Sequence, residues 1–475
     1  MLSLLILVPL AGLLLLNLPF TPAMKRTAWA FAFTVALAQV AMVLVAPAAA
    51  WSQQGFLAQY FSFGLEAKDL TRVLLLAIGI VMATTLMVGR SMITDDRQQF
   101  NFVNLLLVSI IGMNGVVLVT DLFSLYVFLE VTSVSSFILI AFNRDLGGLE
   151  GAFKYLILSA VATVLMLTGV ALLMLVAGGT SFETVAAAMK TSGGITISQM
   201  AVGAFVCGLF IKGGLVPFHG WLPDAYSSAP APVSILLAGI VTKVSGIYAL
   251  VRLATSVFPA SGAMNEVLMV VGAASIIVGA LAALGQHDLK RMLAYSSISQ
   301  MGYIVLGLGC GTPLGIVGAV FHLFNHAIFK TLLFVNSAAI EQRTGTTDMN
   351  RMGGLGSRMP VTGVTSTIAA LSTAGVPPLA GFWSKLIIVI ALWQAHDYGF
   401  AGIAVLMSVV TLAYLLLMQR RIFFGKTSPE HAGVREAAAG VVVPELVLAA
   451  LTVAVGLLFP WVLNTFMLPV GGIFH

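Results

Sequence analysis

Four lysines and one glutamate lie inside stretches of sequence that are otherwise almost entirely apolar. These residues are Lys212, Lys243, Lys330, Lys385 and Glu130. A charge at the centre of a membrane costs about 2.5–3.5 kcal/mol or more. Near the centre of a span, the lysine ammonium would have to extend about 15 Å to reach the headgroups, which is farther than its side chain reaches. We therefore expect a hydrated interior in which these groups gain and lose protons, because burial favours the neutral amine and a nearby carboxylate favours the ammonium.

A second group of ionisable residues follows a helical spacing. The stretch FHLFNHAIFKTLLF places His322, His326 and Lys330 at positions i, i+4 and i+8, which lie on one face of a helix. Imidazole titrates near neutral pH and can accept a proton on one nitrogen while releasing one from the other. Two alternatives are ordinary core histidines and a zinc site, but no third ligand such as Glu or Cys occurs nearby. A proton relay is the favoured interpretation, and no metal site is predicted.

Two helices are predicted to be interrupted by proline. The first is FIKGGLVPFHGWLPDAYSSAPAPVS, with its break at Pro217, and the second is STAGVPPLAGFWSKLII, with its break at Pro377 and Pro378. Lys212 precedes the first break and Lys385 follows the second. Irregular backbone is tolerated at membrane depth only where it lines a cavity or is buried in protein. A matched pair of interrupted helices is typical of inverted-repeat transporters.

The composition determines the elements that hold these groups. Of the 475 residues, 59% are hydrophobic and only 9% are charged, whereas soluble domains carry about 25% charged residues. Apolar stretches of about 20 residues recur along the chain, as expected of membrane-spanning helices. We predict an all-α polytopic membrane protein with fourteen spans, centred near residues 11, 38, 80, 111, 132, 165, 208, 241, 275, 300, 328, 375, 411 and 454. The two cysteines lie in apolar runs and indicate neither a disulfide framework nor a metal site.

The loop lysines and arginines predict the orientation. With fourteen spans, one face carries fifteen of them: Lys25, Arg26, Arg90, Arg97, Arg144, Lys154, Lys290, Arg291, Arg343, Arg351, Arg358, Arg420, Arg421, Lys426 and Arg435. The other face carries four: Lys68, Arg72, Lys190 and Arg252. The positive-inside rule makes the first face cytoplasmic, which places both termini on the outer face.

Four stretches of the sequence resemble a known family. They are HGWLPDAYSSAPAPVSILLAGIVTKVSGIYALVR, QHDLKRMLAYSSISQMGY, FHLFNHAIFKTLLF and GVPPLAGFWSK. They are similar to the antiporter-like membrane subunits shared by respiratory complex I, membrane-bound hydrogenases and multisubunit sodium/proton antiporters. The resemblance implies a single membrane domain, residues 1–475, with about fourteen helices. Two inverted five-helix repeats, each with a broken helix, would cover about 100–255 and 264–425, and peripheral helices would cover 1–95 and 441–470.

The resemblance also implies roles for individual residues. Glu130 matches the glutamate of the fifth helix and Lys212 the broken-helix lysine with which it pairs. Lys243 matches the lysine that links two half-channels. His322, His326 and Lys330 match the eleventh-helix relay, and Lys385 matches the terminal residue on the broken twelfth helix. We expect protons to move along this series, with the order inside the histidine region left open.

The expected function is that of an ion-translocating subunit of a complex I-like redox or hydrogenase complex in the inner membrane of a prokaryote. Nothing in the chain resembles a flavin, iron–sulfur or nucleotide motif. We therefore predict no cofactor in this chain, no nucleic-acid binding, and redox chemistry only in partner subunits. Other antiporter-like membrane subunits and lipids are the expected partners. The alternatives are a subunit of a secondary sodium/proton antiporter, a self-sufficient organic-anion transporter and a structural anchor; the last two fit poorly with ionisable groups spread over many helices.

Overall fold

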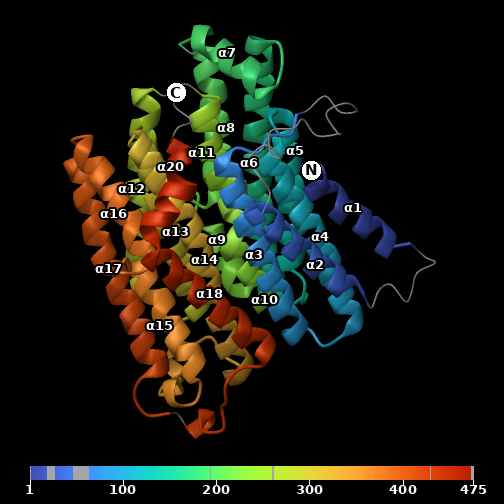
Figure 1. The fold of residues 1–475 in the computed structure, drawn as a ribbon, viewed down its shortest axis with the longest axis vertical. Helices are drawn as coiled ribbons and strands as arrows, with labels where there is room; N and C mark the ends of the chain where they lie inside the picture. Colours follow the sequence, from blue (N-terminus) through green and yellow to red (C-terminus); the bar gives the residue numbers. More distant parts are fainter. Residues whose placement is uncertain are drawn as a thin grey trace.

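The computed structural model describes residues 2–18, 27–45, 64–192, 194–258, 261–427 and 429–471. These residues form a bundle of helices packed side by side (Figure 1). Among them there is no β-strand, only three isolated bridges between loop residues. Lys25 and Arg26, which count toward the predicted charge asymmetry, lie outside the described residues.

The helices follow one another in a simple order along the chain. The first half contains α1 (Leu4–Leu16), α2 (Ala28–Val45), α3 (Asp69–Met92), α4 (Asp96–Leu118), α5 (Leu122–Ile140), α6 (Leu146–Ala177), α7 (Phe182–Ser192), α8 (Thr196–Gly213), α9 (Trp221–Ser228), α10 (Ala231–Leu236), η4 (Leu237–Val241), η5 (Lys243–Tyr248) and α11 (Ala249–Ser256). The second half contains α12 (Gly262–Leu284), α13 (Leu289–Gly309), α14 (Pro313–Thr344), η6 (Met349–Arg351), η7 (Leu355–Ser357), α15 (Pro360–Ala374), α16 (Ala380–Gln394), α17 (Tyr398–Phe423), η8 (Pro429–His431), α18 (Ala439–Leu457), α19 (Phe459–Val462), η9 (Leu463–Met467) and α20 (Leu468–Gly471).

Eleven helical segments of the described chain are long and apolar enough to cross a membrane. They coincide with eleven of the fourteen predicted spans, α10 to α11 counting as one continuous segment. The other three predicted centres fall in α1, in α13 and at the break between α15 and α16. Length and apolarity therefore support eleven spans, and the count of fourteen stays a prediction.

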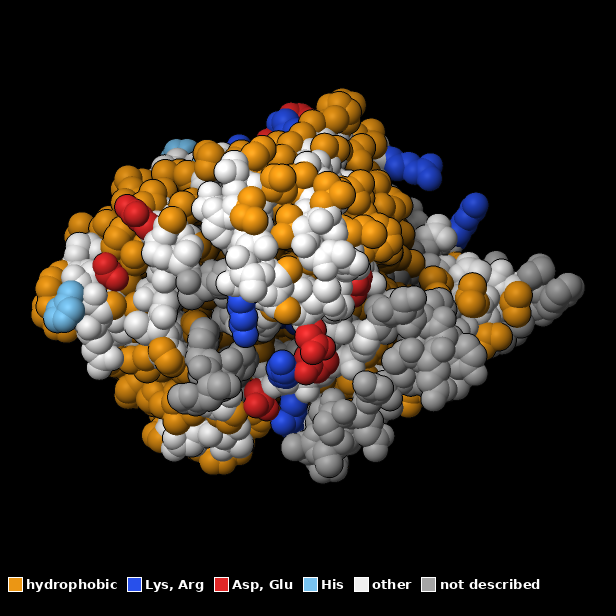
Figure 2. Space-filling view, turned by 90° about the horizontal axis from the view of Figure 1, so that it is seen from above, with side chains coloured by type: hydrophobic (Ala, Val, Ile, Leu, Met, Phe, Trp, Pro, Cys, Tyr) orange, Lys and Arg blue, Asp and Glu red, His pale blue; other side chains and the backbone are white. Residues whose placement is uncertain are grey.

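Two helical segments form the centre of the bundle. Residues 231–253 and residues 315–340 of α14 are all buried, whereas α6 and α17 expose many apolar side chains at the periphery. In the end view of Figure 2, apolar side chains cover much of the rim and a few charged ones lie near the middle. Because Lys243 and the α14 residues His322, His326 and Lys330 belong to the two central segments, the fold places them away from the lipid-facing surface.

Element lengths recur between the two halves of the bundle. α4 and α12 each have 23 residues, and α6 and α14 each have 32. The segments 231–256 and 398–423 each have 26. α8 and α15 each end at a glycine with positive φ, Gly214 at 63° and Gly375 at 88°. Both breaks also contain a cis peptide bond before a proline, Pro217 and Pro378.

A pair of aspartates caps corresponding helices in the same way. Asp121 caps α5 by accepting the Ser124 N–H at 2.8 Å, and its second oxygen accepts the Thr180 hydroxyl at 2.5 Å. Asp288 caps α13 by accepting the Arg291 N–H at 2.8 Å, and its second oxygen accepts the Thr347 hydroxyl. In each half, one side chain therefore fixes the start of a helix against the loop that follows the next one.

Candidate functional site

The first polar cluster joins α5, α6 and α8. The Lys212 ammonium lies 2.9 Å from Glu130 Oε1 and donates to Ser133 Oγ at 2.7 Å and to Ser159 Oγ at 3.0 Å. Thr163 also donates to Glu130 Oε1, at 2.7 Å. The Lys212 side chain is 1% exposed and that of Glu130 is 28% exposed. The structure thus brings Lys212 and Glu130 together as an ion pair in which hydroxyl groups satisfy the remaining hydrogen-bonding capacity.

The helix break after Lys212 is held by specific contacts. α8 ends at Gly214, whose positive φ favours glycine because it lacks a Cβ. The indole N–H of Trp221 donates to the carbonyl of Ile211 at 3.0 Å, and the backbone N–H of Val216 donates to Ser275 Oγ at 3.1 Å. These contacts satisfy groups that the interruption frees, and they fix Lys212 at the last turn of α8.

Lys243 lies at the centre of the bundle, and no acidic side chain is within ion-pair distance of it in the part of the chain that the structure describes. It is wholly buried, and its ammonium donates to the carbonyl of Ala238. It opens η5, one of two π-helical stretches in this segment; such wide turns are frequent at functional sites. A Cβ on Gly246 would lie 2.3 Å from the Cα of Gly213. The segment that carries Lys243 is therefore packed directly against the end of α8, which carries Lys212.

His322, His326 and Lys330 form a line along one face of α14. All three are wholly buried, and the two imidazole rings lie 6.2 Å apart and nearly parallel. His322 Nδ1 is hydrogen-bonded to Ser384 Oγ at 2.9 Å, and Lys330 donates to the carbonyl of Leu293 at 2.9 Å. Among the described residues, neither ring nitrogen of His326 has a partner. Unpartnered buried imidazoles are costly, and water is the usual partner of such groups.

Lys385 lies just after the second break, on α16. Its side chain is buried, and its ammonium donates to the carbonyl of Ala374 at 3.4 Å and lies 4.4 Å from the centre of the Tyr303 ring. Ala374 is the last residue of α15, so the lysine bridges the interruption. The contact with the ring is a cation–π interaction. The ammonium therefore has weak neutral partners and no carboxylate within ion-pair distance among the described residues.

The central basic groups interact with one another. His326 lies one helical turn from His322 and one turn from Lys330 on the same face of α14. Like charges in a poorly solvated interior repel strongly, so these groups cannot all be protonated together. By contrast, Lys212 has Glu130 beside it. The arrangement can hold a small number of protons that are shared among several sites, which is what a relay requires.

No direct hydrogen bond joins Lys212 to Lys243 in the part of the chain that the structure describes. Several buried polar atoms on α13 and α14 have no protein partner, including the amide of Gln300 and the hydroxyls of Ser299 and Ser337. Polar atoms of this kind are the usual ligands of buried water. Any connection between the lysines would run through water held by such groups.

Several polar neighbours of the site are absent from the sequence-based prediction. Lys212 contacts Ser133 and Ser159, and Glu130 contacts Thr163. On the other side of the bundle, His322 contacts Ser384 and Lys385 contacts Tyr303. The spacing of Ser133 after Glu130, and of Thr163 after Ser159, is the only sequence signal for them, since residues three or four apart share a helix face.

Two basic residues that the charge pattern assigns to loops are buried in helices. Lys290, assigned to the cytoplasmic face, lies in α13, is 3% exposed and pairs with Glu341 at 2.7 Å. The charge pattern predicts an outer loop for Arg252, but this residue lies in α11, is 6% exposed, and donates to the carbonyl of Val117 at 2.7 Å. Its guanidinium also lies 5.1 Å from the centre of the Phe182 ring. Arg252 follows a long apolar run and lies near its end, where a basic residue normally marks the start of a loop. The sequence therefore does not indicate that Arg252 is buried.

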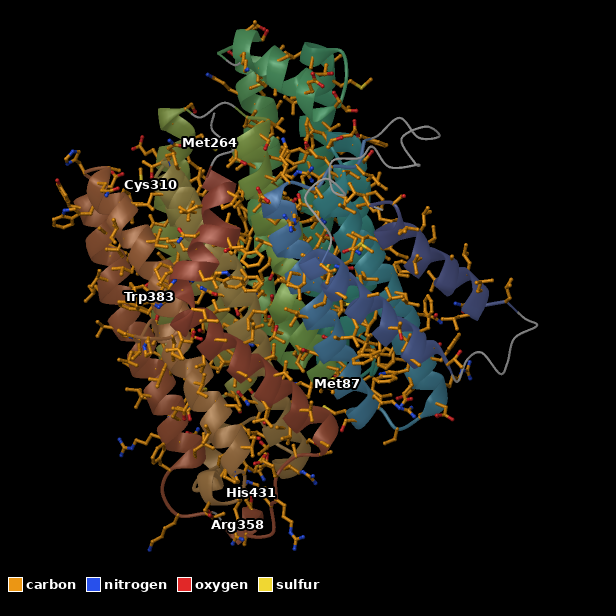
Figure 3. All side chains as sticks on the ribbon, viewed as in Figure 1. Met87, Met264, Cys310, Arg358, Trp383 and His431 are labelled. Carbon is orange, nitrogen blue, oxygen red and sulfur yellow. The ribbon has the colours of Figure 1, made fainter. Side chains whose placement is uncertain are left out.

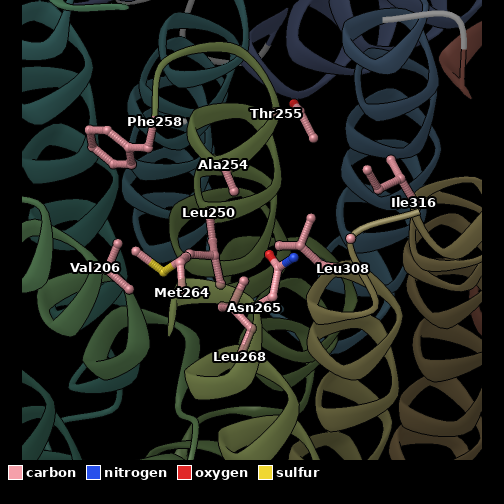
Figure 4. A pocket seen from close by; sticks show the side chains of 11 residues that line it. Val206, Leu250, Ala254, Thr255, Phe258, Met264, Asn265, Leu268, Leu308 and Ile316 are labelled. Carbon is pink, nitrogen blue, oxygen red and sulfur yellow. The ribbon is translucent and has the colours of Figure 1, made fainter. Parts of the chain in front are cut away.

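Two cavities in the described part of the chain lie apart from the buried charges. A cavity of about 30 Å³ lies near one end of the bundle and is lined mostly by apolar side chains, with Asn265 and Thr255 among them (Figure 4). A second, of about 300 Å³, is lined mainly by apolar residues of α2, α3, α18 and η9. None of the predicted relay residues lines either cavity.

Comparison with known proteins gives consistent similarities. Residues 119–411 match the protein family described as NADH:quinone oxidoreductase/Mrp antiporter, transmembrane. The chain is 37% identical over 376 residues to an NADH-quinone oxidoreductase subunit of Desulforudis audaxviator, and the match covers 76% of this chain and 75% of that protein. It is 32% identical over 397 residues to a Na⁺/H⁺ antiporter subunit of Alkalihalophilus pseudofirmus, covering 83% and 80%. A chain of the Mrp complex from Dietzia sp. DQ12-45-1b superposes with a TM-score of 0.91 at 26% identity, covering 100% of this chain and 98% of that one.

Proposed function

The chain belongs to the NADH:quinone oxidoreductase/Mrp antiporter transmembrane family, and from that premise we propose that it is the proton-translocating, antiporter-like subunit of a multisubunit membrane complex. The complex is driven by a redox or hydrogenase reaction in partner subunits. Similarity to a subunit of NADH-quinone oxidoreductase over three quarters of both chains supports this assignment. The chain itself supplies the membrane path and no redox centre.

The observation that carries the proposal is the series of buried ionisable groups. It begins at the Lys212–Glu130 pair, continues through Lys243, and passes along α14 to Lys385. Separation of Lys212 from Glu130 removes the charge that favours the ammonium, so the amine releases its proton toward Lys243. His322, His326 and Lys330 then pass the proton toward Lys385. Each step depends on water, which the unpartnered polar atoms of α13 and α14 are suited to hold.

The fold that accompanies this function has fourteen spans and two inverted five-helix repeats, at about 100–255 and 264–425. The equal lengths of α4 and α12 and of α6 and α14 support the repeat, as do the matching aspartate caps. The breaks at Pro217 and at Pro377 and Pro378 occupy corresponding places in the two repeats. Residues 1–95 and 441–470 form the peripheral helices.

The site of action is the cytoplasmic membrane of a prokaryote, with both termini on the outer face. The charge asymmetry of the loops supports this orientation. Arg358, from the more basic set, lies at the end of the bundle opposite α7, which carries Lys190 of the less basic set (Figure 3).

A subunit of a multisubunit sodium/proton antiporter is the second candidate function. Similarity to the antiporter subunit of Alkalihalophilus pseudofirmus and the TM-score of 0.91 with a chain of the Dietzia Mrp complex favour it. Both candidates use the same path through the chain. They differ in what drives it, because an antiporter uses an existing ion gradient and needs no redox partner.

Mass spectrometry of the intact purified complex tests the proposal. The chain would be tagged in its natural host and purified in mild detergent together with everything that is stably bound. We expect iron–sulfur or nickel–iron hydrogenase subunits and further antiporter-like subunits to co-purify. Recovery of small cation-antiporter subunits alone would favour the second candidate. A chain that purifies without other membrane subunits and is stabilised by an organic anion would contradict both.

A further inference from the structure

A buried carboxyl group lies outside the series described above. Glu445, on α18, is wholly buried, and no lysine, arginine or histidine lies within ion-pair distance of it among the described residues. Its neighbours are Thr362 at the start of α15, Asn336 on α14 and the carboxylate of Glu436. An ionised carboxylate in such surroundings would be an uncompensated buried charge, which costs several kcal/mol.

Counting hydrogens at Thr362 shows what is missing. Its hydroxyl oxygen lies 2.7 Å from Glu436 Oε1, and 3.2 and 3.1 Å from the two oxygens of Glu445. A hydroxyl carries one hydrogen, so it donates to only one of these acceptors. The shortest contact assigns that hydrogen to Glu436. The contact with Glu445 then lacks a hydrogen, and a proton on the Glu445 carboxyl, donated to the Thr362 hydroxyl oxygen, would supply it.

Asn336 gives an independent indication of the same kind. Its side chain is 1% exposed and lies beside the Glu445 carboxyl. The amide nitrogen donates to Thr365 Oγ1 at 2.8 Å, but the amide oxygen has no partner in the described part of the chain. A buried amide oxygen without a donor is rare and costly. A proton on the neighbouring Glu445 carboxyl would supply such a donor.

The cluster also connects two regions of the molecule. Glu436 belongs to the segment between α17 and α18, where its carboxylate accepts the backbone N–H of Val361 at 2.8 Å, and it is only half-buried. On the inner side, Ser337 follows Asn336, has an unpartnered hydroxyl, and lies seven residues beyond Lys330 on nearly the same face of α14. The helical rise puts Ser337 about 10 Å from Lys330 along the axis.

We propose that Glu445 is a proton-binding residue and that Glu436, Thr362, Glu445 and Asn336 form an inlet for protons. The inlet leads from the loop between α17 and α18, at the end of the bundle marked by Arg358 and His431 in Figure 3, toward Lys330. A proton taken from water by Glu436 moves to Glu445, which releases it to water near Ser337. The protonation of Glu445 does not depend on the proposed function, whereas the direction of proton transfer rests on it.

Infrared difference spectroscopy of the assembled complex tests the protonation directly. We expect a carbonyl band of a protonated carboxyl at neutral pH that shifts in D₂O and is lost in Glu445→Gln. Glu430→Gln is the matched control, since Glu430 is an exposed residue of the same loop, 63% exposed and paired with Arg351; it should leave the band unchanged. Thr362→Val keeps Glu445 in place and should shift the frequency of the band, which provides a second readout if Glu445→Gln assembles poorly.

Transport by the same variants tests the inlet. We expect Glu445→Gln to lower the rate of proton translocation by roughly one to two orders of magnitude, as the loss of a positioned acid or base does. Glu430→Gln should retain the normal rate. Absence of a Glu445-dependent band at neutral pH would overturn the protonation. A band that is present while Glu445→Gln pumps normally would overturn the inlet, and neither result depends on whether Lys243 is part of the relay.

Discussion

The buried lysines differ in the groups that contact each ammonium. Lys212 has a carboxylate at 2.9 Å and two hydroxyl groups, whereas Lys243 has only a backbone carbonyl and Lys385 a carbonyl and an aromatic ring. Of the three, Lys212 is therefore the one whose charge has a carboxylate beside it. In the proposed relay, movement of this carboxylate changes which lysine carries the charge.

Replacement of Glu130 tests this dependence. Glu130→Gln leaves the Lys212 ammonium without its counter-charge, and breaking a buried ion pair by removing one partner costs about 3–5 kcal/mol. We expect lower thermal stability of the assembled complex and loss of most proton translocation. The double variant Glu130→Gln/Lys212→Met should regain stability but not transport, because no buried charge remains and no proton carrier remains either.

Glu150→Gln is the matched control for this pair. Glu150 also forms an ion pair with a lysine, Lys154, but its side chain is 66% exposed. Exposed pairs contribute little, about 0–1 kcal/mol. Stability and transport should both be nearly normal. Equal losses in Glu130→Gln and Glu150→Gln would contradict a special role for the buried pair.

Single residues were predictable from the sequence to the extent that their chemistry stood out from apolar neighbours. Lys212, Lys243, Lys330 and Lys385 did so, and all four are buried. Ser133, Ser159 and Thr163 did not, since hydroxyl residues are common in membrane helices and bond to the preceding turn. Glu445 was not predicted as a site residue, because one acidic residue near the start of a span is ordinary. Only the folded structure shows that no basic side chain of the described residues pairs with it.

At the scale of elements, contact between two glycines sets the distance between the first lysines. A Cβ on Gly246 would lie 2.3 Å from the Gly213 Cα, a separation that real Cβ atoms do not show. We expect Gly246→Ala to separate η5 from the end of α8 and to destabilise the protein by about 1–3 kcal/mol, as overpacking does. Because Lys212 and Lys243 lie on these two elements, proton translocation should fall as well.

Gly203→Ala provides the comparison. Gly203 is on the same helix, α8, and a Cβ there would meet nothing within 4 Å. Alanine also favours the helical state over glycine. Normal thermal stability and transport are therefore expected for Gly203→Ala. If Gly246→Ala behaved like Gly203→Ala in both measurements, the close approach of the two helices would be irrelevant to function.

Helix breaks and spans were accessible from sequence, but the detailed shape of the central segment was not. Proline and glycine mark a break because one lacks an N–H and the other tolerates positive φ. The π-helical turns around Lys243 contain no proline, and neither Gly239 nor Gly246 within them has a positive φ, so LAGIVTKVSGIYALV reads as an ordinary apolar helix. They arise from packing inside the bundle, which local sequence does not encode.

At the scale of the whole molecule, the orientation can be tested by labelling from one side. In a background with Cys207 and Cys310 replaced by alanine, we expect Lys190→Cys to react with a membrane-impermeant maleimide in intact cells. Arg358→Cys should react only after the membrane is opened, because it lies at the opposite end of the bundle. Both side chains are exposed. The reverse pattern would invert the proposed topology.

The class of fold followed from the low charge content together with the apolar stretches of about 20 residues, since a helix of that length crosses a membrane with its backbone hydrogen bonds satisfied. Eleven of the predicted spans are long and apolar in the structure. α1 and α15 are shorter, and α13 contains a larger share of polar residues, so length and apolarity do not identify these three. The exposed apolar faces of α6 and α17 suit contact with lipid and with other membrane subunits.

Proton translocation by the assembled complex with Lys243→Ala tests the central claim most directly. The variant removes the basic group at the centre of the bundle, and the exposed Lys190→Ala serves as the control. Driven proton uptake would be measured in inverted membrane vesicles that contain equal amounts of assembled complex. We predict a decrease of roughly one to two orders of magnitude for Lys243→Ala and none for Lys190→Ala. Undiminished uptake in Lys243→Ala with normal assembly would contradict a relay through the buried lysines.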